Sequence, residues 1–192
     1  MPRPSSDPTA FLTTRRTTLE PMTPGHASEL FRILSDPRIY EFIPEDPPIS
    51  EGALRSRIER WVIGPGPGTR ELWFNWAIRL NRERNVAGTL QATIASDERR
   101  ALIAYILGPE FWGQGIATEA VRRLLSWLST RGDVSEIIAL VDSRNAPSIR
   151  LVGRLGFELI GTEQNAGFFK GNRSDEHTFR LAVPPPPQAS GE

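Results

Sequence analysis

The alternation of apolar and polar positions predicts a series of strands along the chain. Residues 101–107, Ala-Leu-Ile-Ala-Tyr-Ile-Leu, form a continuous apolar run that is typical of a buried strand. Two strand-like runs precede it, and polar turns at 81–85 and 97–100 separate the three. Such an order predicts an antiparallel sheet in this half of the chain. The remaining expectations are strands at 11–19, 72–80, 86–96, 134–141, 157–162 and 176–182, and a loop at 165–174.

A period of three to four residues predicts helices between these strands. The strongest signal follows residue 115, where one helix face collects the apolar residues Ala117, Ala120, Val121, Leu124, Leu125 and Leu128. Other helices are expected at 25–34, 50–62 and 146–155. Ser50 and Asn145 precede two of them and are suited to cap the first turn.

Two glycines, Gly113 and Gly115, lie between the apolar strand 101–107 and the strongest helix. The first turn of a helix has unpaired N–H groups and the positive end of the backbone dipole. Glycines let an anion approach the backbone closely, because they carry no Cβ atom. The order strand, glycine loop, helix therefore predicts a site for a pyrophosphate group, although a loop that only connects the two elements would look the same.

The predicted elements make an α+β protein with one domain at 10–183. The first half consists of hairpin-linked strands, and the second contains a strand–helix–strand crossover, which places two strands in parallel with a helix on one face. Segments 1–9 and 184–192 are rich in proline and small polar residues, so we expect both to be disordered. The predicted fold is a mixed, mostly antiparallel sheet flanked by helices.

The composition narrows the classes of function. Lys plus Arg equals Asp plus Glu at 23 each, so no basic excess indicates a nucleic-acid partner. There are no cysteines, which excludes disulfides, thiolate metal sites and a cysteine nucleophile, and two isolated histidines do not predict a metal site. No apolar run is long enough to span a bilayer, and the N-terminus lacks the apolar segment of a signal peptide. We expect a cytoplasmic protein without a membrane partner.

Three segments, taken in order, resemble the GNAT superfamily of acyl-CoA-dependent N-acetyltransferases. They are Tyr105-Ile-Leu-Gly-Pro-Glu-Phe-Trp-Gly-Gln-Gly-Ile-Ala-Thr-Glu-Ala120, Asn145-Ala-Pro-Ser148 and Leu155-Gly-Phe157. The resemblance covers residues 10–182 and is closest to the branch that acetylates the N-termini of ribosomal proteins. In the family's phosphate-loop pattern, the position of an Arg or Gln is taken here by Trp112, as is common in this branch.

The resemblance implies a binding site for acetyl-CoA as co-substrate. Backbone N–H groups of the loop would hold the pyrophosphate, the strand end would diverge from its neighbour and pair with the pantetheine arm, and Asn145 and Ser148 would contact coenzyme A near its thiol. The implied cofactor-binding residues are Tyr105, Ile106, Leu107, Gly113, Gln114, Gly115, Ile116, Ala117, Thr118, Asn145 and Ser148.

The implied reaction is direct transfer of the acetyl group from the thioester to a neutral primary amine. A backbone N–H would stabilise the oxyanion, while a base and an acid move the protons. The family's usual proton carriers are missing here, because the matching positions hold Val152, Leu102 and Ile160. Ser148 remains as a proton donor to the thiolate. The base stays unassigned, with Glu163 and His177 as the nearest titratable residues.

The acceptor is a protein N-terminus or a small molecule such as an aminoglycoside, a polyamine or an amino acid. Aromatic residues expected to line its pocket, or else the core, are Tyr40, Phe42, Trp73 and Trp76. Two alternatives have a different function: a dinucleotide-binding domain, suggested by the paired glycines and Asp142, and a non-catalytic relative that binds acetyl-CoA. A monomer and a homodimer are both compatible with the sequence.

Overall fold

The computed structural model describes residues 10–184, so the disorder expected for 1–9 and 185–192 lies outside the described residues. The strands form one eight-stranded sheet in the order β1-β2-β3-β4-β5-β6-β8-β7. Their bounds are β1 Leu12–Thr13, β2 Thr17–Pro21, β3 Glu71–Leu80, β4 Val86–Ala95, β5 Arg100–Leu107, β6 Glu136–Asp142, β7 Glu158–Phe169 and β8 Asn172–Ala182. Only β5 and β6 pair in parallel. The α+β prediction is confirmed. The dinucleotide-binding alternative is wrong, because that fold has a mostly parallel sheet and this sheet is mostly antiparallel.

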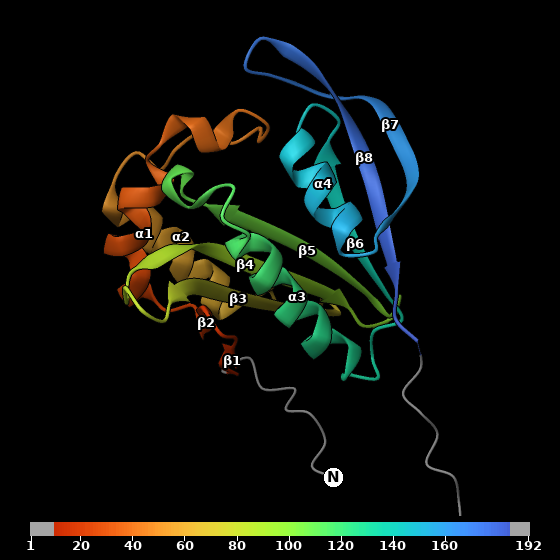
Figure 1. The fold of residues 1–192 in the computed structure, drawn as a ribbon, viewed down its shortest axis with the longest axis horizontal. Coiled ribbons are helices and arrows are strands. Elements are labelled where there is room, and N and C mark those ends of the chain that lie inside the picture. Colours follow the sequence, from red (N-terminus) through yellow and green to blue (C-terminus); the bar gives the residue numbers. More distant parts are fainter. Residues whose placement is uncertain (1–9, 185–192) are drawn as a thin grey trace, which may run out of the picture.

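Helices cover both faces of the sheet (Figure 1). Helices α1 (Ala27–Leu34) and α2 (Glu51–Ile63) pack on one face against β3 and β4. Helices α3 (Ile116–Ser129) and α4 (Ala146–Arg154) pack on the other face over the main core. Three short 3₁₀ turns, η1 (Pro24–His26), η2 (Pro37–Tyr40) and η3 (Pro109–Phe111), complete the described elements. Two apolar clusters, one on each face, hold the sheet between them.

The N-terminal strand expected at 11–19 is instead two short antiparallel strands, β1 and β2. The reason is local. The Thr14 hydroxyl accepts from the Thr17 N–H at 2.8 Å, and the Thr14 N–H donates to the Thr17 carbonyl at 2.8 Å. A side chain that bonds the neighbouring backbone in this way favours a turn over a continuous strand. This turn places Arg16 at the start of α3, where it contacts the glycine loop.

The loop expected at 165–174 is wrong, because β7 and β8 form a long hairpin there. The turn lies at Lys170 and Gly171, whose φ angles are +52° and +76°. Two successive residues with positive φ are the mark of the tightest hairpin turn. Asparagines and glycines in the segment concealed its strand character, since these residues are depleted in strands.

Strand β5 separates from β6 soon after the two begin to pair. Their parallel ladder contains Arg100↔Glu136, Ala101↔Ile137 and Leu102↔Ile138 and then ends, although both strands continue. Figure 1 shows β5 and β6 running apart from this junction, with α4 beside the gap. The predicted divergence of the strand at Tyr105-Ile106-Leu107 is confirmed as a feature of the backbone.

The opposite edge of β5 is held tightly against β4. A Cβ atom built on Gly88 would lie 2.0 Å from the Ile106 carbonyl oxygen, so only glycine fits there. The pairing of β3 with β4 shifts register beside it, between Ile78 and Arg79. A glycine inside a strand is typical of a bulge or of a close backbone approach, and both occur here. This contact fixes the last residues of β5 on one side, while the other side faces the gap.

Candidate active site

The glycine loop has the backbone conformation expected of an anion cradle. Gly113 and Gly115 have φ angles of +72° and +73°, which residues with a Cβ atom rarely adopt. A Cβ on Gly113 would meet no atom within 4 Å, and one on Gly115 would meet only the Arg16 Nη2 atom at 3.5 Å. Space therefore lies above the loop where α3 begins. Residues Gln114, Ile116, Ala117 and Thr118 complete the loop and the first turn.

A clamp that the sequence did not reveal holds this loop. The Arg16 Nη1 donates to the Gln114 carbonyl at 2.9 Å, and the Arg16 Nε donates to the Glu119 carboxylate at 2.5 Å. Glu119 also accepts from the Thr14 hydroxyl at 2.6 Å and the Arg16 N–H at 2.8 Å. Burial acts to raise the pKa of Glu119, but these hydrogen bonds lower it by more, so the pKa of Glu119 lies below its ordinary value. The carboxylate stays charged and keeps the loop in place.

Trp112, at the position where the family pattern has Arg or Gln, has a structural role at the loop. Its indole N–H donates to the carbonyl of Leu107, the last residue of β5, at 2.8 Å. The ring remains 49% exposed. Trp112 therefore ties the loop to the strand end and offers an open aromatic surface beside the glycines.

The gap between β5 and β6 has hydroxyl groups on its two sides. Asn145 caps α4 by accepting from the Ser148 N–H at 3.1 Å, which confirms the predicted cap. The Ser148 hydroxyl lies 2.6 Å from the Tyr105 hydroxyl of β5. The structure thus brings Tyr105, Asn145 and Ser148 together, with Ile106 and Leu107 next along β5. Val152, at a position where the resembled family often carries a proton-donating Tyr, is fully buried.

The C-terminal end of β6 is fixed by a buried carboxylate. Asp142 accepts from the Arg144 N–H at 2.8 Å, Arg144 Nε at 2.9 Å, Arg144 Nη2 at 2.6 Å and the Ser174 hydroxyl at 2.6 Å. Burial acts to raise the pKa of Asp142, yet the bonds from Arg144 and Ser174 lower it to about 2. This cluster connects β6 to β8 and sets the direction of the chain that enters Asn145.

The hairpin tip reaches the loop that follows η2. The Arg144 guanidinium lies 5.9 Å from the Phe42 ring and 5.3 Å from the Phe169 ring, within the range of cation–π contact. Lys170 at the tip forms an ion pair with Asp46. The two segments are distant in sequence, and their contacts close one end of the site (Figure 1).

Titratable groups on β7 and β8 lie across β6 from the gap. His177 Nδ1 is 2.9 Å from the Thr162 hydroxyl, and its ring packs edge-on against Phe179. Glu176 is the cross-strand neighbour of both Asp142 and Glu163. Burial, followed by these two carboxylates, raises the pKa of Glu176. Sequence reasoning named Glu163 and His177 as base candidates and missed Glu176, whose environment depends on three strands.

The sheet face that carries α1 and α2 is left uncovered beside the gap. Leu102 on β5 and Leu140 on β6 are 39% and 45% exposed there. Of the four aromatic residues expected at an acceptor pocket or else in the core, two lie in the core: Trp76 is fully buried, and Tyr40 is buried with its hydroxyl bonded to the Leu34 carbonyl. Both pack where the apolar ring gains most from burial. Trp73 remains half-buried on the open face.

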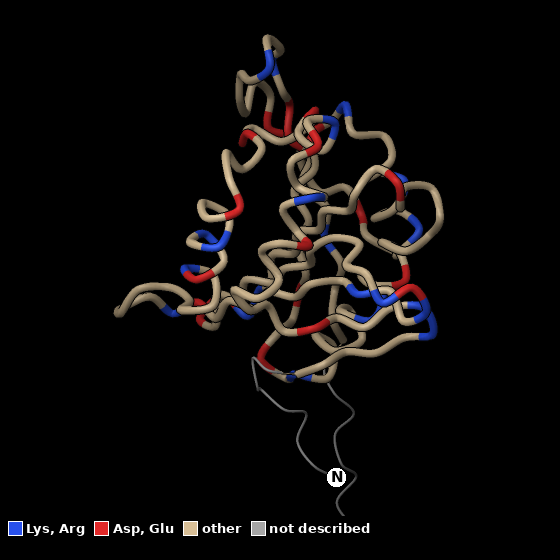
Figure 2. The backbone as a smooth tube through the Cα atoms, turned by 90° about the vertical axis from the view of Figure 1, so that its left-hand side faces the viewer, with Lys and Arg blue, Asp and Glu red and all other residues tan. Residues whose placement is uncertain are grey.

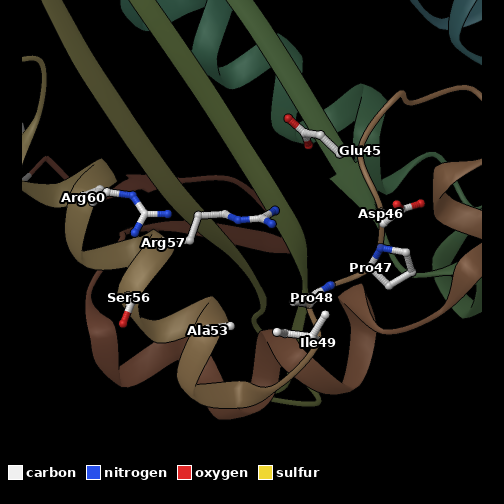
Figure 3. A pocket seen from close by; sticks show the side chains of 9 residues that line it. All are labelled: Glu45, Asp46, Pro47, Pro48, Ile49, Ala53, Ser56, Arg57 and Arg60. Carbon is white, nitrogen blue, oxygen red and sulfur yellow. The ribbon is translucent and has the colours of Figure 1, made fainter. Parts of the chain in front are cut away.

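A cleft of about 520 Å³ opens on the same side of the sheet, between the loop after η2 and α2. Figure 3 shows Arg57 extending from α2 toward the loop that carries Glu45, with the head of Arg60 beside it. Among residues 10–184, neither arginine forms an ion pair within 4.0 Å. The remaining lining residues are Asp46, Pro47, Pro48, Ile49, Ala53 and Ser56.

The described part of the chain carries no group of three or more potential metal ligands. Basic and acidic positions are interspersed along the backbone (Figure 2). Residues 10–184 contain no helix that is both long and apolar enough to cross a membrane.

Comparisons with known proteins agree with this geometry. A family model described as "Acetyltransferase (GNAT) domain" matches residues 16–158. The uncharacterized N-acetyltransferase p20 of Bacillus licheniformis is 30% identical over 173 residues, which span 88% of this chain and 94% of that protein. Among solved structures, the ribosomal L7/L12 alpha-N-protein acetyltransferase RimL, in complex with coenzyme A, gives a TM-score of 0.81 at 20% identity, covering 91% of this chain and 98% of that one. The microcin C7 self-immunity acetyltransferase MccE, in complex with acetyl-CoA and AMP, gives 0.77 at 23% identity, covering 88% and 94%.

Proposed function

Because the chain belongs to the acetyltransferase (GNAT) family, we propose that it acetylates the N-terminal amine of a peptide or protein in the gap between β5 and β6. Family membership makes the chain an N-acetyltransferase, which transfers an acetyl group from acetyl-CoA to an amine. The observation that carries the location is the coincidence of three features: the early end of the β5–β6 ladder, the two open glycines and the capped helix α4.

The residues present fit coenzyme A. The space above Gly113 and Gly115 is what a pyrophosphate needs, and the first turn of α3 supplies N–H groups to bind it. The Ile106 carbonyl lies against β4, and the Leu107 carbonyl already accepts from Trp112, so the groups that we propose for the pantetheine arm are those of Tyr105 and the Leu107 N–H. Bound there, the thioester supplies the activated acetyl group. Holding thioester and amine together accounts for much of the rate enhancement that such a site can provide.

The reaction needs a base that takes a proton from the amine and an acid that gives one to the leaving sulfur. Ser148 lies beside the gap at the start of α4 and is our proposed donor to the leaving sulfur. For the base we propose Glu176 over Glu163 and His177. Burial and the neighbouring carboxylates raise its pKa, which makes it a stronger base than an ordinary carboxylate, and it lies on β8 beside the end of β6.

The open cleft supports an acceptor that carries both charges. Arg57 and Arg60 would repel a polyamine, whereas they would attract an acidic side chain that follows a peptide's N-terminus. Glu45 on the facing wall would attract the amine itself. The RimL comparison supports a protein N-terminus, and the MccE comparison supports a small acceptor that bears a phosphate. We propose that the acceptor is a peptide with acidic residues after its first position, encountered in the cytoplasm.

The test is a panel of acceptors assayed by release of the coenzyme A thiol. Its members are peptides that begin Ser-Asp-Glu and Ser-Lys-Lys, spermidine and free serine. We expect the highest kcat/KM for the acidic peptide, and a loss of at least tenfold for that peptide alone in Arg57→Ala. Arg122→Ala, on the exposed face of α3, is the matched control. A preference for spermidine would reverse the assignment of the acceptor, and acetyl-CoA binding without transfer to any amine would support the non-catalytic alternative.

A further inference from the structure

Two hydroxyl groups meet across the gap between β5 and α4. Tyr105 lies three residues beyond Leu102, the last residue of β5 that pairs with β6. Its hydroxyl is 2.6 Å from that of Ser148, in the first turn of α4. The Ser148 backbone is fixed by Asn145, so the hydroxyl pair has a defined position. It joins the two walls of the site at the level where α4 begins.

The environment of Tyr105 keeps its hydroxyl protonated. The Tyr105 ring is half-buried and lies against the main core on the face that carries α3 and α4. Burial raises the pKa of Tyr105, and its bond to Ser148 offsets this only in part. The phenol therefore holds its proton at neutral pH. Within residues 10–184, it is the one titratable side chain hydrogen-bonded to the Ser148 hydroxyl.

A serine hydroxyl is too weak an acid to end a proton-transfer step by itself. When it gives a proton to a departing sulfur, its oxygen must take another at nearly the same moment. A phenol has a pKa of about 10 in water, much closer to that of a thiol at about 8.5. The partner of Ser148 is thus the kind of group that can replace the proton.

We propose that Tyr105 supplies, through Ser148, the proton that the leaving thiolate takes up; this inference rests on the proposed function. The amine nitrogen forms a bond to the acetyl carbon, and the carbonyl oxygen carries the negative charge. As the carbon–sulfur bond breaks, its electron pair goes to sulfur. Ser148 gives its proton to sulfur and receives the Tyr105 proton. The phenolate regains a proton from solvent, into which the base has released the one lost by the amine.

In this arrangement Tyr105 takes the role of the tyrosine that is missing at position 152. Val152 is buried in the core, so no proton donor can act from that part of α4. Tyr105 instead reaches the start of the same helix from the facing strand. The residue acts on the reaction through Ser148 rather than by touching the sulfur.

The chain contains only two tyrosines, and the second is a matched control. The Tyr40 hydroxyl donates to the Leu34 carbonyl, which cannot pass on a proton. Tyr105→Phe and Tyr40→Phe each remove one partly or fully buried hydroxyl and keep the ring. The comparison therefore separates loss of a hydrogen bond from loss of the proton path.

The experiment measures kcat and KM with the best acceptor of the panel, and the Kd of acetyl-CoA by calorimetry. We expect Tyr105→Phe to lower kcat at least tenfold with the Kd changed less than twofold, while Tyr40→Phe leaves kcat unchanged. The double variant Tyr105→Phe, Ser148→Ala should be little worse than Ser148→Ala alone, because one path is broken in both. An unchanged kcat in Tyr105→Phe, or an equal loss in Tyr40→Phe, would overturn the inference.

A second readout depends on acidity alone. Fluorinated tyrosine at position 105 keeps the shape of the ring and makes the phenol more acidic. The alkaline limb of the kcat–pH profile should then move to lower pH, and the same replacement at position 40 should leave it in place. An unmoved limb would contradict the proton path even if Tyr105→Phe is slow. If the unaltered enzyme acetylates no member of the panel, the proposed function itself fails, and this inference fails with it.

Discussion

The buried carboxylate of Asp142 provides a quantitative test of how the site is held together. Replacing it by Asn keeps the shape but places an amide N–H₂ against donors from Arg144 and Ser174. In the folded protein the pKa of Asp142 falls from 3.8 to about 2. At about 1.4 kcal/mol per pKa unit, this corresponds to a stabilisation of about 2 kcal/mol at pH 7. We expect Asp142→Asn to lose about 2–3 kcal/mol of unfolding free energy.

The sign of the pH dependence follows from the lowered pKa. The contribution is fully present above the unfolded-state pKa and disappears as pH falls through the folded-state pKa of about 2. The difference between wild type and Asp142→Asn should therefore be constant from pH 7 to 5. By pH 3 about half of it should remain. Urea unfolding at pH 7, 5 and 3 measures this.

The chain contains a matched control at the surface. Asp36 accepts from Arg38 N–H, Nε and Nη2, in the same Asp-x-Arg pattern. The side chains of Asp36 and Arg38 are 23% and 67% exposed, whereas those of Asp142 and Arg144 are 4% and 31% exposed. We expect Asp36→Asn to cost much less, because water replaces the lost bonds. An equal loss in the two variants, or a loss in Asp142→Asn that persists unchanged at pH 3, would refute the reasoning.

Three further predictions concern the loop and the proposed base. Gly115→Val should weaken acetyl-CoA binding at least tenfold, about 1.4 kcal/mol, as measured by calorimetry. Gly132→Val, also at positive φ, should lower the stability of the fold but not the affinity for acetyl-CoA. Equal affinity in the two variants would show that the loop is not part of the site. Glu119→Gln should lose about 1–2 kcal/mol at pH 7 and progressively less as pH falls below about 4, because the pKa of Glu119 is lowered. In urea unfolding, no loss at pH 7 would show that the clamp is unimportant, and a loss that does not vary with pH would show that the charge of Glu119 is not its source. Since the pKa of Glu176 is raised, Glu176→Gln should stabilise the fold at pH 7, an advantage that shrinks as pH falls through the folded-state pKa and is gone below the unfolded-state pKa. It should also lower kcat; a stable variant of full activity would exclude Glu176 as the base.

Local signals in the sequence predicted the elements that depend on neighbouring residues. The strand at 101–107, the helix after Gly115 and the caps at Ser50 and Asn145 are all present, although this strand is buried along one face only. Each rests on an apolar pattern or on a side chain that bonds the backbone three residues away. Such interactions are encoded within one turn of helix or one strand.

The parts that the sequence did not predict depend on distant pairs. The Arg16 clamp joins residues 103 positions apart, and the Ser174 bond to Asp142 spans 32. The outer part of the β7–β8 hairpin, which was expected as a loop, escaped prediction because its turn uses a Lys at positive φ and β7 is exposed along most of its length. The raised pKa of Glu176 needs Asp142 and Glu163 on the adjoining strands. None of these leaves a local period or motif.

The short ladder between β5 and β6 also makes a weak seam across the sheet. Three residue pairs join the five strands β1–β5 to the three strands β6–β8, fewer than join any other neighbouring strands except β1 and β2. Transient opening there would expose the amides of β6 and β8 to solvent exchange before those of β3 and β4. A molecule that binds both β5 and β6 beyond the end of their ladder adds the hydrogen bonds that the ladder lacks. Binding should therefore slow amide exchange mainly in strands β6–β8, so that a co-substrate serves for a time as part of the sheet.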